Sequence, residues 1–184
     1  GKVGVYCGWV ASMDEGWTRL VLDLFDFNHE RLDNERVRKG KLLEEYSVII
    51  LPSLGADAIV KGHEGIGWPP EYRGGIGKEG VENLKEFVSR GGTLIALREA
   101  CRLVVREFEI PVYEEERTGE DFYCPGSLIR LEVDNTHSLG YGMPEKTAGF
   151  YSDGVILGTK LPLAGGPDRR VVARYGSKDI LCLL

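Results

Sequence analysis

The chain has 184 residues, of which 42% are apolar and 28% are charged, and its 29 acidic and 23 basic side chains give a formal net charge of −6. This size and balance are typical of a soluble globular domain with a sizeable core. An acidic surface of mixed sign offers no electrostatic footprint for nucleic acid or an anionic membrane, and no apolar run reaches the roughly 18 residues of a spanning helix. We therefore expect neither nucleic acid nor a membrane as a partner.

The chain begins at Gly1, directly before Lys2 to Tyr6, a run with the pattern of a strand. We expect a fragment of a longer polypeptide, whose targeting signal would lie outside it, so the sequence predicts no compartment. Glycine is abundant, with 25 residues, where about 7% of a chain is usual. Much of the excess falls between Gly55 and Gly92, which predicts unusual backbone in that stretch.

Cysteine and histidine are sparse and scattered. The cysteines stand at positions 7, 101, 124 and 182, without a C-x-x-C pair, and the histidines at 29, 63 and 137, without H-E-x-x-H spacing. A chain of this length needs no disulfide framework, so we expect reduced, mostly buried thiols. Zinc sites need ligands at fixed spacings, so we expect no metal and no cofactor in this segment.

The first half alternates predicted strands and helices. Val3 to Tyr6 forms a short apolar run, and Ser12-Met13-Asp14-Glu15 has the S-x-x-E form of a capping box at the start of a helix. Apolar residues then recur at helical spacing and predict one apolar stripe on that helix. The stripe consists of Trp17, Leu20, Val21, Leu24 and Phe25. Ser47 to Leu51, which Pro52 ends, reads as a strand covered on both faces.

Two further helices flank a third predicted strand. The first runs from about Lys78 to Arg90 and ends at Gly91-Gly92; Thr93 to Leu97 follows as a strand, and Glu99 to Phe108 as a helix. Short joints between alternating strands and helices favour a parallel sheet with helices on both faces. We predict a three-layer α/β/α domain with parallel strands near residues 3–6, 47–52 and 93–97.

The pattern changes beyond Pro111. Leu128 to Val133 alternates as an edge or mixed-sheet strand would, while Val171 to Tyr175 and Asp179 to Leu184 predict an antiparallel hairpin. We therefore expect a small antiparallel addition near the C-terminal end of a single domain, residues 1–184.

Candidate binding residues follow the first two predicted strands, because ligands of open parallel sheets collect at the strands' carboxyl ends. Asp14, Glu15 and Arg19 follow the first strand. A long loop after the second strand carries Trp68 and Tyr72 as apolar platforms and Arg73 as a fork for a carboxylate or phosphate. Asp121 and Tyr123 are expected to complete the rim of a cleft that suits a peptide or a small polar molecule.

Structural roles compete with this interpretation. The loop can be a lid that packs its own aromatic side chains on the sheet edge, and Asp14 or Glu15 can serve only as caps. Gly74-Gly75-Ile76-Gly77 precedes a helix but lacks the G-x-x-x-x-G-K-[ST] pattern of a phosphate loop. We expect these glycines to supply positive φ and close backbone approach.

An enzymatic alternative uses Cys101 as nucleophile and His137 as base, a recurrent acyl-transfer pair. The third strand ends near Leu97, so the elbow position falls on Arg98 or Glu99, and Cys101 lies about one helical turn later. We expect Cys101 to be a buried thiol. His137 lies in a turn-rich loop, whose backbone it can hydrogen-bond.

Five phrases, taken in order, resemble a known family. They are residues 12–19, 69–77, 91–94, 121–127 and 137–144. Together they resemble the region that follows the catalytic domain in bacterial zinc carboxypeptidases of the carboxypeptidase A type. That region is similar to class I glutamine amidotransferase-like domains, which have a flavodoxin-like sheet.

The resemblance implies a non-catalytic accessory domain that shapes substrate access or assembly in a zinc carboxypeptidase. Zinc and its glutamate base would belong to the parent's catalytic domain, since no such apparatus matches here. The amidotransferase likeness would bring a Cys–His–Glu triad, but the nucleophile elbow is missing. The implied partners are the parent's catalytic domain or a second copy of this domain. The alternative remains a self-sufficient cysteine-dependent amidotransferase or hydrolase that uses Cys101 and His137.

Overall fold

The computed structural model describes residues 1–115, 124, 126–152, 154–161, 164 and 166–176. The chain divides into two compact units, Gly1–Glu109 and Ile110–Leu184, and each is described by itself. The expectation of a single domain stays a prediction.

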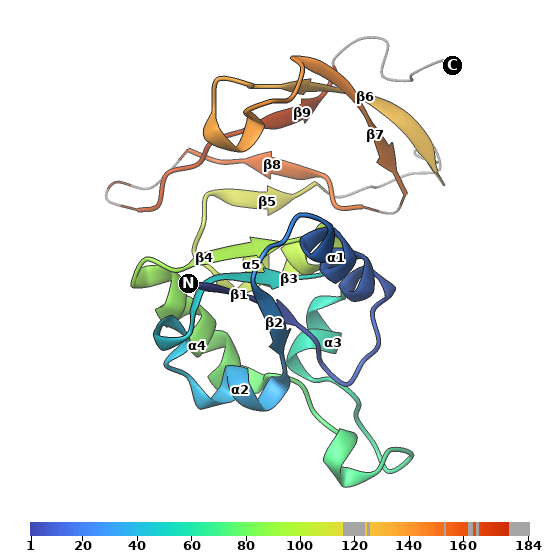
Figure 1. Ribbon diagram of the computed structural model, residues 1–184, viewed down its shortest axis with the longest axis vertical. Coiled ribbons are helices and arrows are strands. Elements are labelled where there is room, and N and C mark those ends of the chain that lie inside the picture. Colours follow the sequence, from blue (N-terminus) through green and yellow to red (C-terminus); the bar gives the residue numbers. More distant parts are fainter. Residues whose placement is uncertain (116–123, 125, 153, 162–163, 165, 177–184) are drawn as a thin grey trace. The chain divides into compact units, whose positions relative to one another are not determined.

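The first unit is built on a four-stranded parallel sheet. Its strands are β1 (Lys2–Tyr6), β2 (His29–Leu32), β3 (Tyr46–Leu51) and β4 (Thr93–Ala96), in the order β2-β1-β3-β4 (Figure 1). This is the beginning of the flavodoxin-like order, in which the chain reverses its direction of winding beside β1. The predicted parallel sheet is confirmed, and β1 lies at its topological switch point.

Helices cover both faces of this sheet. They are α1 (Met13–Leu24), α2 (Asn34–Lys39), α3 (Ala56–Val60), α4 (Gly77–Ser89) and α5 (Cys101–Glu107). One hydrophobic core joins α2 to α5 with the sheet, and includes Ile49, Ile59, Leu84, Phe87 and Leu103. α1 lies on the opposite face (Figure 1), and none of its residues belongs to that core. The three-layer arrangement predicted from the alternation is therefore present in this unit.

Two elements between α1 and β3 were not predicted. β2 is a polar edge strand in which only Leu32 is buried, and α2 has six residues. The α2 termini follow ordinary rules, because the Asp33 side chain accepts from the Arg36 amide at 2.8 Å and Gly40 ends the helix with φ of 73°. The Asp33-to-Gly40 bracket was a usable signal for this helix.

The predicted capping box is wrong. Ser12 makes no side-chain cap on α1; its Oγ instead donates to the Ser53 carbonyl oxygen at 2.8 Å, which ties the loop after β1 to the loop after β3. The Glu15 carboxylate accepts from Arg19. Tertiary partners have replaced the local cap that the pattern favoured.

The second unit is antiparallel. β5 (Val112–Glu114) pairs with β8 (Leu157–Thr159), and β6 (Ser127–Val133) lies between β7 (Lys146–Tyr151) and β9 (Ala173–Tyr175). The predicted strand near 128–133 and the antiparallel addition are confirmed. The hairpin is corrected in part: residues 173–175 pair with β6, and residues 179–184 lie outside the described residues.

Candidate functional site at the carboxyl edge of the parallel sheet

A cavity of about 340 Å³ lies at the carboxyl ends of β1 and β3, where the sheet has its switch point. We call it the edge pocket. It is lined by residues 6–12 and by Glu15, Arg31, Pro52 and Leu54. Its volume falls within the range of small-molecule sites, about 300–1,000 Å³.

Charged side chains cluster along one wall of the edge pocket. Arg31 Nη2 donates to Cys7 Sγ at 2.6 Å, and Arg31 Nε lies 3.9 Å from Glu15 Oε1. Arg19 donates to both Glu15 oxygens, at 2.6 and 3.2 Å. The contact with Cys7 raises the pKa of Arg31, and the bond to Glu15 raises the pKa of Arg19, so both stay charged. Two guanidinium groups face one carboxylate, which leaves a net positive wall.

A buried hydrogen-bond chain fixes the floor of the pocket. Tyr6 Oη donates to Asn34 Oδ1 at 2.7 Å and lies 3.3 Å from the Ile59 carbonyl oxygen, while Asn34 Nδ2 donates to the Gly74 carbonyl oxygen at 3.3 Å. Burial raises the pKa of Tyr6, so the phenol stays protonated and keeps its donor role. A Cβ on Gly8 would lie 2.5 Å from Tyr6 Oη, so only glycine fits this wall.

The loop between β1 and α1 offers backbone donors to the pocket. Within the part of the chain that the structure describes, no amide of residues 8–12 donates to a protein acceptor. Amides that have no protein partner, beside a positive wall, are chemically suited to a carboxylate or another small anion.

The long loop after α3 is held largely by its own contacts. The His63 and Trp68 rings stack at 3.6 Å, and Arg73 donates to the Trp68 carbonyl oxygen at 2.6 Å and the Ile66 carbonyl oxygen at 3.4 Å. Tyr72 meets the Trp9 ring edge-on at 5.1 Å. The loop therefore has the architecture of the self-packed lid considered above, and Trp9 connects it to the edge pocket.

The glycine-rich segment before α4 has the predicted structural role. Gly74 and Gly77 have φ of 78° and 62°, and a Cβ on Gly75 would overlap the Ile59 carbonyl oxygen. Positive φ and close backbone approach explain the segment without a bound phosphate.

A strained elbow follows β4. Arg98 has a left-handed φ of 48° and opens the short helical turn Arg98–Ala100 that leads into α5. Its Nη1 lies 3.5 Å from Asp14 Oδ2. A nucleophile elbow is this kind of turn, with a reactive side chain at its strained residue. Here the strained residue is an arginine.

Cys101 and His137 have local roles. Cys101 is partly buried, and its Sγ donates to the Ala96 carbonyl oxygen at 3.2 Å, one turn beyond the elbow. The His137 Nδ1 accepts from the Leu139 amide at 3.2 Å at the start of a short helical turn, Ser138–Gly140. The expected bond between His137 and its own loop is confirmed. The two residues belong to different units, so their pairing stays a prediction.

The predicted site residues do not gather in one cleft. Glu15 lines the edge pocket, Arg19 binds Glu15, and Asp14 pairs with Arg98. Trp68, Tyr72 and Arg73 belong to the self-packed loop, which contacts Trp9. Asp121 and Tyr123 lie outside the described residues.

Sequence reasoning missed Cys7, Trp9 and Arg31 as lining residues of the edge pocket. Cys7 and Trp9 directly follow the first predicted strand, which was a usable signal. Arg31 had none, because its position depends on the unpredicted β2.

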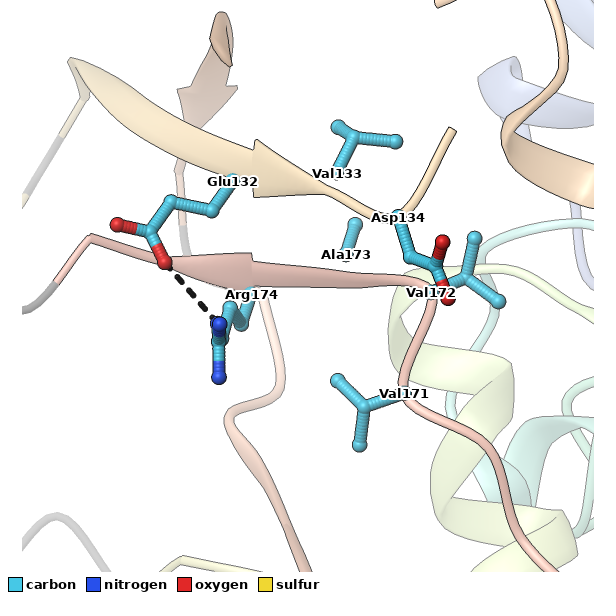
Figure 2. A pocket seen from close by; sticks show the side chains of 7 residues that line it. All are labelled: Glu132, Val133, Asp134, Val171, Val172, Ala173 and Arg174. Atoms are coloured by element: carbon cyan, nitrogen blue, oxygen red, sulfur yellow. Dashed lines mark hydrogen bonds and ion pairs between the residues drawn. The ribbon is translucent and has the colours of Figure 1, made fainter. Parts of the chain in front are cut away.

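A second cavity, about 320 Å³, lies in the C-terminal unit between the end of β6 and the approach to β9 (Figure 2). Arg174 and Glu132 pair at 3.0 Å in its lining, and valines supply much of the rest. Asp134 accepts from the Thr136 hydroxyl and amide at 2.6 and 3.1 Å, and the hydroxyl bond holds its pKa below the usual range. These charged groups already have partners, so the edge pocket is the better ligand site.

Metal and membrane were considered for the described residues alone. Among them, no three histidine, cysteine, aspartate or glutamate side chains come together in a group that could hold a metal ion. No helix in the same residues has the length and apolar character needed to cross a membrane.

Comparison with known proteins identifies the fold. No family model and no curated protein matches the chain. Among solved structures, a GMP synthase component from Thermoplasma acidophilum matches with a TM-score of 0.55 and 9% identity, over 96% of this chain and 75% of that one. PurLQS from Thermotoga maritima matches with a TM-score of 0.56 and 14% identity, over 98% and 76%.

A third structure, a glutamine amidotransferase from Thermotoga maritima, matches with a TM-score of 0.52 and 16% identity, over 86% of this chain and 62% of that one. At such identities the similarity shows the fold alone. The chain has the class I glutamine amidotransferase-like fold, as the sequence resemblance implied.

Proposed function

We propose that the chain is a non-catalytic binding module of a zinc carboxypeptidase-type protein, and that its edge pocket binds a carboxylate-bearing peptide or small molecule. The observation that carries this proposal is Arg98 at the strained elbow.

An elbow serves catalysis by lifting a nucleophile above the sheet edge. The arginine side chain cannot take that role, because its guanidinium stays protonated and has no lone pair to attack a carbonyl. The nearby thiol of Cys101 donates to the backbone end of β4. These residues support a fold whose elbow has lost its chemistry, and they disfavour the cysteine-dependent alternative.

The edge pocket supports the binding role. Arg31 has five N–H donors and uses one on Cys7, so others stay available for a ligand oxygen. The amides of residues 8–12 add donors beside it. A planar guanidinium with neighbouring amides matches the geometry of a carboxylate.

The carboxypeptidase context comes from the sequence resemblance of residues 12–19 and 69–77. A carboxypeptidase acts on chains that end in a free carboxylate, which is the group that the edge pocket is suited to hold. An accessory domain with this pocket would gather substrate ends or fix the assembly. Zinc would lie in the parent's catalytic domain.

The test measures binding of a short peptide with a free C-terminal carboxylate, and of the same peptide amidated, by isothermal titration calorimetry. We expect the free acid to bind and the amide to bind at least about tenfold more weakly, the loss expected for one charge-assisted contact. Arg31→Ala should weaken the free acid to a similar extent. Arg90→Ala is the matched control, because Arg90 is an equally exposed arginine that pairs with Glu86 on α4. Equal binding of acid and amide, or no effect of Arg31→Ala, would overturn the proposal.

A further inference from the structure

The most unusual surface of the first unit is the outward side of α1. Its apolar side chains are 44% to 80% exposed: Met13, Trp17, Leu20, Val21 and Leu24, followed by Phe25 at the helix end. The one buried residue of the helix is Glu15. An amphipathic helix normally buries its apolar stripe, so the reversed orientation indicates a surface that another apolar surface covers.

The size of this surface fits a protein partner. With aromatic side chains of about 150–250 Å² and smaller aliphatic ones, these six residues expose on the order of 500 Å² of side-chain surface. A standard interface buries about 800 Å² per partner, of which the apolar centre is the larger energetic part. The six residues could therefore form the centre of such an interface, with polar neighbours completing its rim.

We propose that the outward side of α1 binds α1 of a second copy of this chain, antiparallel, across a two-fold axis between Leu20 and Val21. This inference is independent of the proposed ligand, because none of these six residues lines the edge pocket.

Shape complementarity favours this arrangement. With the axis at that point, residue numbers that face one another add to 41, so Trp17 meets Leu24 of the second copy and Phe25 meets Gly16. Gly16 has open space around it and no side chain. The bulky Phe25 ring would therefore cover the one gap in the stripe. A helix of twelve residues, about 18 Å long, presents both halves of this pattern to its copy.

Charge complementarity favours it as well. The last turn of α1 has no basic residue, and Asp26 follows the helix at its carboxyl end, where the helix dipole disfavours a negative charge. The antiparallel pair places Asp26 beside the first turn of the other α1, where the dipole favours that charge. The acidic side chains of that first turn have basic partners already, since Asp14 pairs with Arg98 and Glu15 with Arg19.

Analytical ultracentrifugation of the full 184-residue chain tests the proposal. The chain should sediment as a reversible dimer, and Leu20→Glu should weaken the dimer at least tenfold, because two like charges would meet at the axis. Ile66→Glu is the control: Ile66 is 95% exposed on a different surface, so its variant should remain a dimer. Circular dichroism checks that each variant is folded.

Gly16→Trp tests the geometry without adding charge. The open space at Gly16 means that the monomer tolerates the ring, whereas Phe25 of the second copy would collide with it, so the dimer should weaken at least tenfold. A monomeric wild-type chain would overturn the proposal. A dimer that survives Leu20→Glu, or one that resists Gly16→Trp, would overturn it equally.

Discussion

Glu15 and Trp17 lie two residues apart on α1, yet Glu15 has 8% of its surface exposed and Trp17 has 59%. The order is the reverse of their polarity. Glu15 is buried because Arg19 binds both of its oxygens and Arg31 lies nearby, at the edge pocket. α1 is thus oriented by its charged side chain, and its apolar stripe faces outward.

Glu15→Gln should destabilise the fold by about 1 kcal/mol, because the variant keeps the size of the side chain but loses the charge that faces two guanidinium groups. Urea denaturation gives the free energy of unfolding. Glu82→Gln is the matched control, since Glu82 makes an exposed pair with Lys85 and should cost less than about 0.5 kcal/mol. Equal effects of the two variants would mean that Glu15 does not orient α1.

Tyr6→Phe should cost about 1–2 kcal/mol, because the buried Asn34 Oδ1 would lose its donor and find no water in exchange. The free energy of unfolding again reports it. Tyr72→Phe provides the comparison: Tyr72 is 45% exposed and packs on Trp9 through its ring, so its loss should be near zero. A neutral Tyr6→Phe would contradict the account of the pocket floor.

Stability should fall at alkaline pH, and Tyr6 should carry part of the fall. Burial raises the pKa of Tyr6 in the folded state above its ordinary value of 10.0, so its contribution is complete below pH 10 and is lost as the pH rises toward the folded-state pKa. Tyr46 behaves alike, because burial and then its bond to Glu30 raise its pKa.

The comparison is between the wild type and Tyr6→Phe, unfolded in urea at about pH 8 and about pH 10.5, on either side of the ordinary tyrosine pKa. The Tyr46 contribution is common to both proteins and cancels. The wild type should lose more stability across this interval than the variant. Parallel losses would show that Tyr6 does not titrate with folding.

Gly75→Ala should destabilise the chain by more than about 2 kcal/mol, because a Cβ there would overlap the Ile59 carbonyl oxygen and push α3 from the loop. Gly67→Ala, in open space on the same loop, should change stability by less than about 0.5 kcal/mol. Thermal unfolding of the two variants separates a requirement for close approach from a general preference for glycine.

Much of the parallel sheet could be predicted from the sequence, because β1, β3 and β4 are continuous apolar runs and α4 has a clear apolar face. β2 could not, since three of its four residues are polar and it lies at the sheet edge, where neither face needs an apolar run. The contact between Arg31 and Cys7 was lost with it, since the two residues meet only when β2 pairs with β1.

The α1 orientation was also beyond the pattern. Periodicity shows that a helix has an apolar stripe but not which way the stripe faces, and here ion pairs across three elements decide it. The loop after α3 shows the opposite case, because its glycines and aromatic residues predicted a self-packed segment with positive φ.

The most direct test of the central claim, that the elbow holds no nucleophile, is release of glutamate from glutamine by the full 184-residue chain, compared with Cys101→Ala. We predict no release above buffer from either protein, because Arg98 occupies the elbow and Cys101 donates to the Ala96 carbonyl oxygen. Release by the wild type that disappears in Cys101→Ala would contradict the account and establish the cysteine-dependent alternative.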